Sequence, residues 1–278
     1  FMMPHNAAPH MRTTNISTAT TPERKGALCT MFAVYKKEMR SYFINPIGYV
    51  FVGVFLAAAA LLCSYTTLIA KSYDTSNYFT ILIFAFIVLL PLLTMRLFAE
   101  ERKLRTEQLL LTAPVTITGM VIGKSLAAYT MFIGTILVSC VNFIPLYVYA
   151  AKERANASYQ AVHIGPNTPE LIGCLIGIIL IGAAFIAVGM FISALTENQL
   201  AAAVITVAVL LGMSSIGLLS SLIDVYWIRT ILNWISVLSR YTNFANGIFD
   251  FASLLYYLSI TFVFVFLTVR VYEKRRWG

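Results

Sequence analysis

Six long apolar stretches constrain this chain more than any other feature of its sequence. Each is long enough to cross the roughly 30 Å hydrocarbon layer of a bilayer, which requires about 20 helical residues. Backbone polar groups in lipid must be satisfied by a helix or a closed barrel, and uninterrupted apolar runs without strand alternation exclude the barrel. We therefore expect an all-α integral membrane protein with six transmembrane helices near residues 47–70, 77–96, 119–149, 170–194, 200–221 and 252–271.

The charge composition supports a membrane protein. Charged residues make up 12% of the chain, whereas ordinary soluble domains contain about 25%. The formal net charge of +8 does not indicate nucleic-acid binding, because the basic residues flank apolar spans and do not gather on one polar face. The tendency of Lys and Arg to stay on the cytoplasmic side of a membrane explains this distribution.

The same tendency predicts that both termini are cytoplasmic. With that orientation fifteen Lys and Arg residues lie inside and five outside, which is a decisive bias. The outside residues are Lys71, Lys152, Arg154, Arg229 and Arg240. The inside residues are Arg12, Arg24, Lys25, Lys36, Lys37, Arg40, Arg96, Arg102, Lys103, Arg105, Lys124, Arg270, Lys274, Arg275 and Arg276.

The first part of the chain divides into two segments. Residues 1–27 are polar and without periodicity, which predicts a disordered tail; residues 28–278 then form the transmembrane domain. In residues 28–43, cationic and apolar residues recur with a helical period, so that cations lie on one side of the expected helix and apolar residues on the other. We expect an interfacial helix in the headgroup layer, although a basic flank that only sets topology would look similar. Its cations are Lys36, Lys37 and Arg40, and its apolar residues are Leu28, Phe32, Tyr35, Met39 and Tyr42.

Residues 98–114 form a charged segment between the second and third spans, and residues 222–251 form an aromatic one before the sixth. The charged residues of the first segment are Glu100, Glu101, Arg102, Lys103, Arg105 and Glu107. Such a segment contributes little to holding spans together but offers a contact for a protein outside the bilayer. The second segment is too short for two spans and is rich in aromatic residues typical of an interface. We expect it to form one or two short helices that dip into the outer leaflet.

The middle of every predicted span lacks Asp, Glu, Lys, Arg and His. A charge at the bilayer centre costs about 2.5–3.5 kcal/mol on insertion scales, and ion-coupled carriers keep such residues to bind the coupling ion. Their absence argues against a secondary transporter or a proton pump, and it leaves no acid–base or nucleophilic group for an enzyme. The histidines are scattered and no C-x-x-C spacing occurs, so we expect no metal site.

Two glycine patterns require interpretation. Residues 119–125, GMVIGKS, resemble a phosphate-binding loop, but that motif needs four residues between its glycines and a preceding strand. We interpret this stretch as the start of a helix with Lys124 at the membrane interface, and expect no ATP on this chain. Gly173 and Gly177 form a G-x-x-x-G pair that permits close helix packing, within the chain or across a dimer.

Residues 100–129, EERKLRTEQLLLTAPVTITGMVIGKSLAAY, resemble the permease subunits of type-2 ABC exporters. Residues 193–202, SALTENQLAA, and 240–259, RYTNFANGIFDFASLLYYLS, are similar to the gliding-motility-type branch of that family. Other family members often carry Gly at the position of Arg105. The resemblance implies six spans, an interfacial helix before the first and re-entrant helices before the last. It also implies that residues 98–114 are a cytoplasmic coupling helix in contact with a separate ATPase subunit. The residues that match the family at this helix are Glu100, Glu101, Arg102, Lys103, Thr106, Leu109, Leu110 and Pro114. Glu197 and Asn198 would form a second, smaller cytoplasmic contact.

The functional expectation is a permease subunit of an ATP-driven ABC transporter, and small outer loops favour an exporter. The expected partners are two copies of an ATPase subunit, a second transmembrane subunit, either identical or related, membrane lipid and, in some relatives, an extracytoplasmic accessory subunit. ATP and Mg²⁺ belong on the ATPase, so this chain has no cofactor and is not an enzyme. We expect it in the cytoplasmic (inner) membrane of a prokaryote. The alternative is a passive channel or membrane scaffold without energy input, which has no need of the charged segment.

Overall fold

The computed structural model describes residues 22–70, 73–105, 116–156, 165–222 and 225–277. Every regular element in these ranges is a helix, and six helices are long and apolar enough to cross a membrane. The predicted fold class is therefore confirmed. In chain order the α-helices are α1 (Pro22–Ile44), α2 (Pro46–Cys63), α3 (Ser76–Thr94), α4 (Arg96–Lys103), α6 (Ile117–Ser139), α7 (Ile144–Asn156), α8 (Thr168–Leu195), α9 (Gln199–Leu222), α10 (Tyr226–Ile235), α11 (Val237–Ala245) and α12 (Phe251–Trp277).

The six candidate spans agree with the predicted stretches. They cover Pro46–Thr67, Ser76–Lys103, Ile117–Lys152, Thr168–Leu195, Gln199–Gly217 and Phe251–Arg276. The second runs from α3 into α4, and the third runs from α6 through a 3-10 turn over Cys140–Phe143 into α7. The 3-10 turn ends two residues before Pro145, whose missing N–H and bulky ring disfavour a regular α-helix in the preceding turn.

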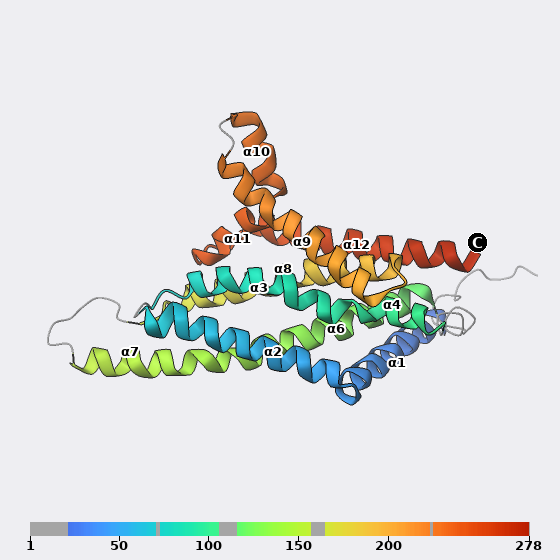
Figure 1. Ribbon diagram of the computed structural model, residues 1–278, viewed down its shortest axis with the longest axis horizontal. Helices are drawn as coiled ribbons and strands as arrows, with labels where there is room; N and C mark the ends of the chain where they lie inside the picture. Colours follow the sequence, from blue (N-terminus) through green and yellow to red (C-terminus); the bar gives the residue numbers. More distant parts are fainter. Residues whose placement is uncertain (1–21, 71–72, 106–115, 157–164, 223–224, 278) are drawn as a thin grey trace, which may run out of the picture.

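Helix α8 lies at the centre of the bundle. It packs against α3, α4, α6, α9, α11 and α12. Its glycines permit close contacts, because a Cβ on Gly173 would lie 2.6 Å from the carbonyl oxygen of Phe244, and one on Gly177 would lie 2.9 Å from the ring of Tyr241. The G-x-x-x-G pair therefore serves packing within the chain. Figure 1 shows α11 beside the N-terminal part of α8, and α4 near its opposite end.

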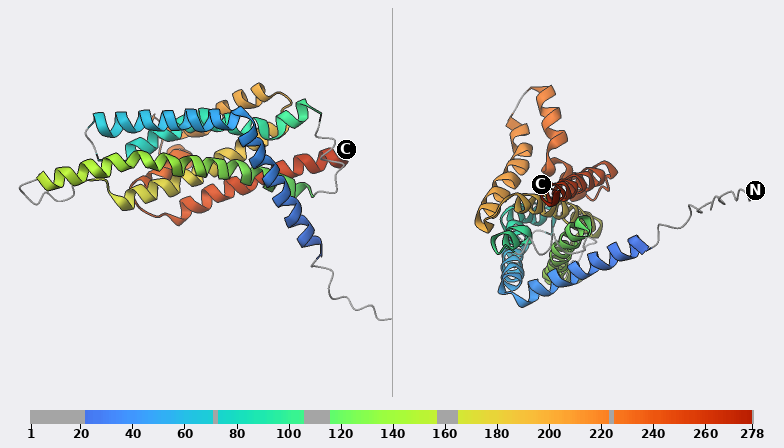
Figure 2. Two further views of the ribbon diagram at one scale, coloured as in Figure 1. Left: turned by 90° about the horizontal axis from the view of Figure 1, so that it is seen from below. Right: turned by 90° about the vertical axis from the view of Figure 1, so that its right-hand side faces the viewer.

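Helix α1 runs obliquely to the long axis of the bundle, and it lies at the same end as α4 and the C-terminus of α12 (Figures 1 and 2). It begins at Pro22, so it includes the last residues of the segment for which the sequence predicts disorder. Asn45 is extended because it precedes Pro46, and the turn there separates α1 from α2. Tyr42 is buried against the bundle while Phe32 is 63% exposed. The predicted apolar face of α1 is thus divided between the bundle core and the surroundings.

The predicted segment 98–114 is not one continuous helix. Helix α4 begins at Arg96 and ends at Lys103, and residues 106–115 lie outside the described part of the chain. Arg105 has φ of 56°, a left-handed conformation that ends the helix and that glycine adopts at the least cost. The Gly that similar permeases often carry here would adopt this conformation readily. Between α9 and α12 the structure has two short helices, α10 and α11, as the sequence predicts; their depth in a membrane stays a prediction.

Candidate functional site

The candidate site surrounds α4, at the end of the bundle that also holds the C-terminus of α12 (Figure 1). Leu97, Phe98 and Ala99 are buried, whereas Lys103 and Arg105 are exposed. Apolar side chains in its first turn thus fix α4 to the core, while its C-terminal end projects from the bundle. Helices α1, α6 and α8 then add polar bonds to this short helix.

Lys124 of α6 is the most buried charged residue of the site, with 1% of its side chain exposed. Its Nζ lies 2.9 Å from Glu38 Oε1 of α1 and 2.9 Å from Glu101 Oε1 of α4, and it donates a hydrogen bond of 2.9 Å to the carbonyl oxygen of Leu97. An ammonium group has three N–H donors, so these acceptors satisfy all of them. Burial of a charge is expensive unless it is paired and hydrogen-bonded, and this arrangement meets both conditions.

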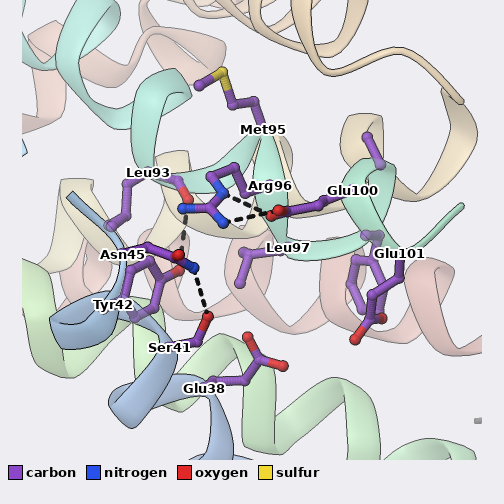
Figure 3. A network of polar contacts seen from close by, with 12 residues as sticks. Glu38, Ser41, Tyr42, Asn45, Leu93, Met95, Arg96, Leu97, Glu100 and Glu101 are labelled. Carbon is purple, nitrogen blue, oxygen red and sulfur yellow. Dashed lines mark hydrogen bonds and ion pairs between the residues drawn. The ribbon is translucent and has the colours of Figure 1, made fainter. Parts of the chain in front are cut away.

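Two further ion pairs surround Lys124. Lys37 of α1 lies 3.4 Å from Glu101 Oε1, and Arg96 bonds both carboxylate oxygens of Glu100, at 2.6 and 2.9 Å. Figure 3 shows side chains of α1 facing those of α4 across this contact. We call the following set the charged junction: Lys37, Glu38, Arg96, Glu100, Glu101 and Lys124.

The buried hydroxyl of Tyr42 borders the charged junction and donates a hydrogen bond of 3.5 Å to the carbonyl oxygen of Leu93 (Figure 3). Burial, together with the nearby charge of Glu38, raises the pKa of Tyr42 above its usual range. The tyrosine therefore stays a neutral donor at physiological pH and adds no charge of its own to the junction.

A glycine brings α1 close enough for these ion pairs to form. A Cβ on Gly123 would lie 2.9 Å from the carbonyl oxygen of Met31 and 3.2 Å from the side chain of Val34. Gly123 therefore lets the backbone of α1 approach α6 one residue before Lys124. The stretch that resembles a phosphate-binding loop lies within α6, and its Gly-Lys pair serves helix contact and ion pairing.

Helices α4 and α8 cap each other. The first four N–H groups of a helix have no partner within it, nor do the last four carbonyls. Ser193 Oγ of α8 accepts hydrogen bonds from the backbone N–H of Phe98 (3.2 Å) and Ala99 (3.1 Å), in the first turn of α4. In return, Arg102 of α4 donates to the carbonyl oxygen of Leu195 (3.0 Å), at the end of α8. Arg275 of α12 donates to the adjacent carbonyl oxygen of Ala194 (2.6 Å).

The turn between α8 and α9 also contacts α4. Glu197 lies 2.7 Å from Arg102, and the side-chain oxygen of Asn198 accepts a hydrogen bond of 3.1 Å from the N–H of Leu200 at the start of α9. The structure thus places Glu197, which the resemblance assigns with Asn198 to a second cytoplasmic contact, next to Arg102 of the charged segment. Glu197 is 73% exposed, so this ion pair borders solvent.

The structure brings together only some of the predicted site residues. Glu100, Glu101 and Arg102 all bond within the chain, whereas Lys103 is exposed. Lys36 and Arg40 are exposed on α1, away from the charged junction. The predicted residues that lie outside the described part of the chain are Thr106, Leu109, Leu110 and Pro114.

The sequence prediction missed Glu38, Ser193 and Arg275 and placed Lys124 at an interface. One signal could have identified Glu38, because it occurs at helical spacing from Tyr35 and Tyr42, on the side of α1 that faces the bundle. An acidic residue on that side calls for a cation on a neighbouring helix. The sequence carries no comparable signal for Ser193, since a serine within an apolar span is common.

Comparison with known families identifies the chain. The family model described as "ABC-2 family transporter protein" matches residues 64–271, which is more than half of the 278-residue chain. The chain belongs to the ABC-2 family. It is therefore a multi-pass membrane protein and a permease component of an ABC transporter, not itself catalytic, and the family implies association with an ABC ATPase and a transmembrane partner. Among individually curated proteins no match was found.

Proposed function

We propose that this ABC-2 permease is an exporter subunit that receives the work of ATP hydrolysis through α4. In this proposal the α4 end of the bundle is cytoplasmic, as the Lys and Arg distribution predicts, and two copies of a separate ATPase subunit dock there. ATP and Mg²⁺ are bound by the ATPase. A second transmembrane subunit, identical or related, completes the translocation path in the cytoplasmic membrane of a prokaryote.

The observation that carries this proposal is the set of polar bonds around α4. This short helix is joined by ion pairs or hydrogen bonds to α1 through Lys37, to α6 through Lys124 and to α8 through Ser193. Packed elements move together when contacts between them are rigid. A displacement of α4 by an ATPase would therefore reach three neighbouring helices at once.

The charges of α4 suggest a division of roles. Glu100 and Glu101 are paired inside the chain, so we assign them to transmission between helices. Lys103, Leu104 and Arg105 are exposed, and with the residues that follow them they supply the contact with the ATPase. Export of a lipid, an amphipathic peptide or a lipid-linked molecule suits spans whose middle parts carry no charged residue. An extracytoplasmic accessory subunit and the gliding-motility-type branch stay predictions from the resemblance.

Co-purification tests the proposed contact. The tagged full-length chain is purified from its native cells, and the bound protein is identified by mass spectrometry and by its ATP hydrolysis. We expect Lys103→Glu to reduce the recovered ATPase severalfold, because it reverses a charge in the proposed contact. Lys274→Glu is the matched control, since Lys274 is an exposed cation at the same end but on α12.

A transport assay tests transmission. In proteoliposomes that contain the purified complex, Glu101→Lys should abolish ATP-dependent export, because it adds a third cation beside Lys37 and Lys124. The complex should still contain its ATPase if Glu101 acts within the permease. Recovery of a folded chain without any ATPase, or ATP-independent flux through the chain alone, would exclude the proposal and support the channel alternative.

A further inference from the structure

A second polar site lies between α10, α11 and the start of α12, toward the end of the bundle opposite α4. In Figure 1, α10 projects from the side of the bundle there. It is an open cleft of about 750 Å³. Helix α10 contributes Asn233 and Trp234, α11 contributes Arg240 and Asn243, and α12 contributes Leu255. The cleft thus combines one cation, amide groups and apolar surface. None of these residues belongs to the charged junction or to the reciprocal caps of α4.

Arg240 is held between two aromatic rings. Its guanidinium carbon lies 5.4 Å from the ring centroid of Trp234 and 5.2 Å from that of Tyr256. The hydroxyl of Tyr256 donates a hydrogen bond to the carbonyl oxygen of Ile235, which fixes this ring. Cation–π contacts with two rings restrain the guanidinium group without using its N–H groups. This geometry prepares Arg240 to bind a planar or tetrahedral anion.

Asp250, which bonds to the cleft residue Asn243, is held by several donors. Asp250 accepts hydrogen bonds from Asn243 Nδ2 (3.1 Å), from Ser253 Oγ (2.6 Å) and from the N–H of Ala252 (3.0 Å). Within the ranges that the structure describes, no carboxylate lies within 4.0 Å of the Arg240 guanidinium. In the part of the chain that the structure describes, no carboxylate therefore neutralises the positive charge of Arg240.

The cleft continues into an apolar face of α12. Phe251, Leu255, Leu258 and Phe262 follow one another at spacings of three and four, so they share one side of this helix. Their side chains are 64%, 51%, 48% and 71% exposed, respectively, and Leu255 also lines the cleft. A small soluble anion would use only the polar part of this surface. A molecule with an anionic headgroup and an acyl chain would use both parts.

We propose that this cleft binds the anionic headgroup of a membrane amphiphile, with a phosphate or carboxylate group on Arg240 and the acyl chain along α12. Under the proposed orientation of the chain, the site faces the outer leaflet. The inference depends on the geometry of α10–α12 alone. It does not require the ATPase, so it can fail or hold independently of the proposed coupling function.

Native mass spectrometry of the full chain, purified and incorporated into nanodiscs, tests the proposal. The discs contain phosphatidylcholine with a minor fraction of phosphatidylglycerol, and the lipid retained by the released protein is counted. We expect the wild-type chain to retain phosphatidylglycerol in preference to phosphatidylcholine. Arg240→Gln should weaken this retention about tenfold, as expected for loss of a charged hydrogen bond.

The matched control is Arg229→Gln, because Arg229 is an exposed arginine of α10 outside the set of cleft residues. It removes the same charge, so equal losses in the two variants would overturn the proposal, as would equal retention of the two lipids by the wild type. Arg240→Lys keeps the charge but loses the planar stack, and we expect it to lose part of the preference. Should Arg240→Gln fail to fold in a thermal unfolding assay, the comparison of Arg240→Lys with Arg229→Lys decides the proposal.

A competition experiment distinguishes the sources of the anion. Inorganic phosphate in large excess should leave phosphatidylglycerol bound if the acyl chain contributes through α12. Displacement of phosphatidylglycerol by phosphate alone would show that the cleft binds a free anion and would overturn the proposed amphiphile site. Phe262→Ser should lower lipid retention without changing phosphate binding, because Phe262 extends the apolar face beyond the cleft.

Discussion

At the α4 end of the bundle, Lys124 is enclosed by two carboxylates and a carbonyl oxygen. Toward the opposite end, Arg240 makes cation–π contacts with two rings and lines an open cleft. Both are cations near the end of an apolar bundle, and both need stabilisation. Lys124 receives this stabilisation from acceptors on other helices, so its ion pairs join those helices. Arg240 receives only part of this stabilisation from the described residues, so its charge can bind a ligand. Whether a charge is structural or available thus depends on which acceptors surround it.

Loss of the enclosed cation should have the largest effect. Lys124→Met leaves the largely enclosed Glu38 without its cation and Glu101 with only the more distant Lys37. We expect the free energy of unfolding to fall by about 3–5 kcal/mol in a denaturant titration in detergent micelles. The control is Lys37→Met, because Lys37 is 61% exposed and an exposed pair contributes about 0–1 kcal/mol. Similar losses in both variants would contradict the enclosed state of Lys124.

The close helix contacts at the two ends provide the second comparison. Gly123→Ala places a Cβ against the carbonyl of Met31 at the α4 end, and Gly173→Ala places one against the carbonyl of Phe244 at the cleft end. We expect each to cost about 1–3 kcal/mol of unfolding free energy through overpacking. Gly134→Ala is the control, because nothing lies within 4 Å of its added Cβ. Only Gly173→Ala should also reduce retention of phosphatidylglycerol, since it displaces α11. A reduced retention of phosphatidylglycerol in Gly123→Ala would count against separate roles for the two ends.

Removal of the Ser193 hydroxyl should have a moderate effect that is confined to the α4 end. Ser193→Ala removes the side-chain acceptor of the N–H groups of Phe98 and Ala99, and we expect a loss of about 1–2 kcal/mol. Faster hydrogen exchange at these two amides would show that the cap is lost. The control is Ser259→Ala, an exposed serine of α12 that bonds within its own helix. Unchanged exchange in Ser193→Ala would show that α4 does not depend on α8 for its cap.

The smallest effect concerns Asp250 and pH. Hydrogen bonds from Ser253 and Asn243 lower the pKa of Asp250 below its usual value. A carboxylate with a lowered pKa stabilises the folded state above the unfolded-state pKa, and this contribution is lost as pH falls through the folded-state value. Lowering the pH should therefore loosen the start of α12 only at pH values below the range in which Asp usually titrates. Ser253→Ala should move the titration upward, as a carboxyl NMR signal of Asp250 would report; an unchanged titration would mean that these bonds do not hold the carboxylate.

Much of the fold could be predicted from the sequence because the constraints are local. An apolar stretch of about 20 residues in lipid has to be a helix, so the spans near 47–70 and 170–194 differ from the observed ones only at their ends. The break at Pro46 and the short helices before α12 also depend on neighbouring residues. The end of α4 could not be predicted in this way, because nothing in the residue type of Arg105 indicates a left-handed conformation.

The candidate site was predictable in its location but not in its connections. The excess of charge in residues 98–114 marked α4, and the resemblance added Glu197, which lies beside Arg102. The roles of Lys124 and Glu38 could not be obtained from either. These residues are 86 positions apart in the chain, and local periodicity carries no information on which helix faces which.

By itself, the sequence determined that the chain forms six membrane-spanning helices, that its charges gather outside the middle of the spans, and that a charged segment separates the second span from the third. These properties follow from the free energy of placing each residue in lipid or water, which depends on residue type and on neighbours along the chain. Only the tertiary structure decided that Lys124 is enclosed while Arg240 faces a cleft. That outcome depends on which acceptors distant helices bring within a few ångströms of each cation, and packing of the whole bundle sets those distances.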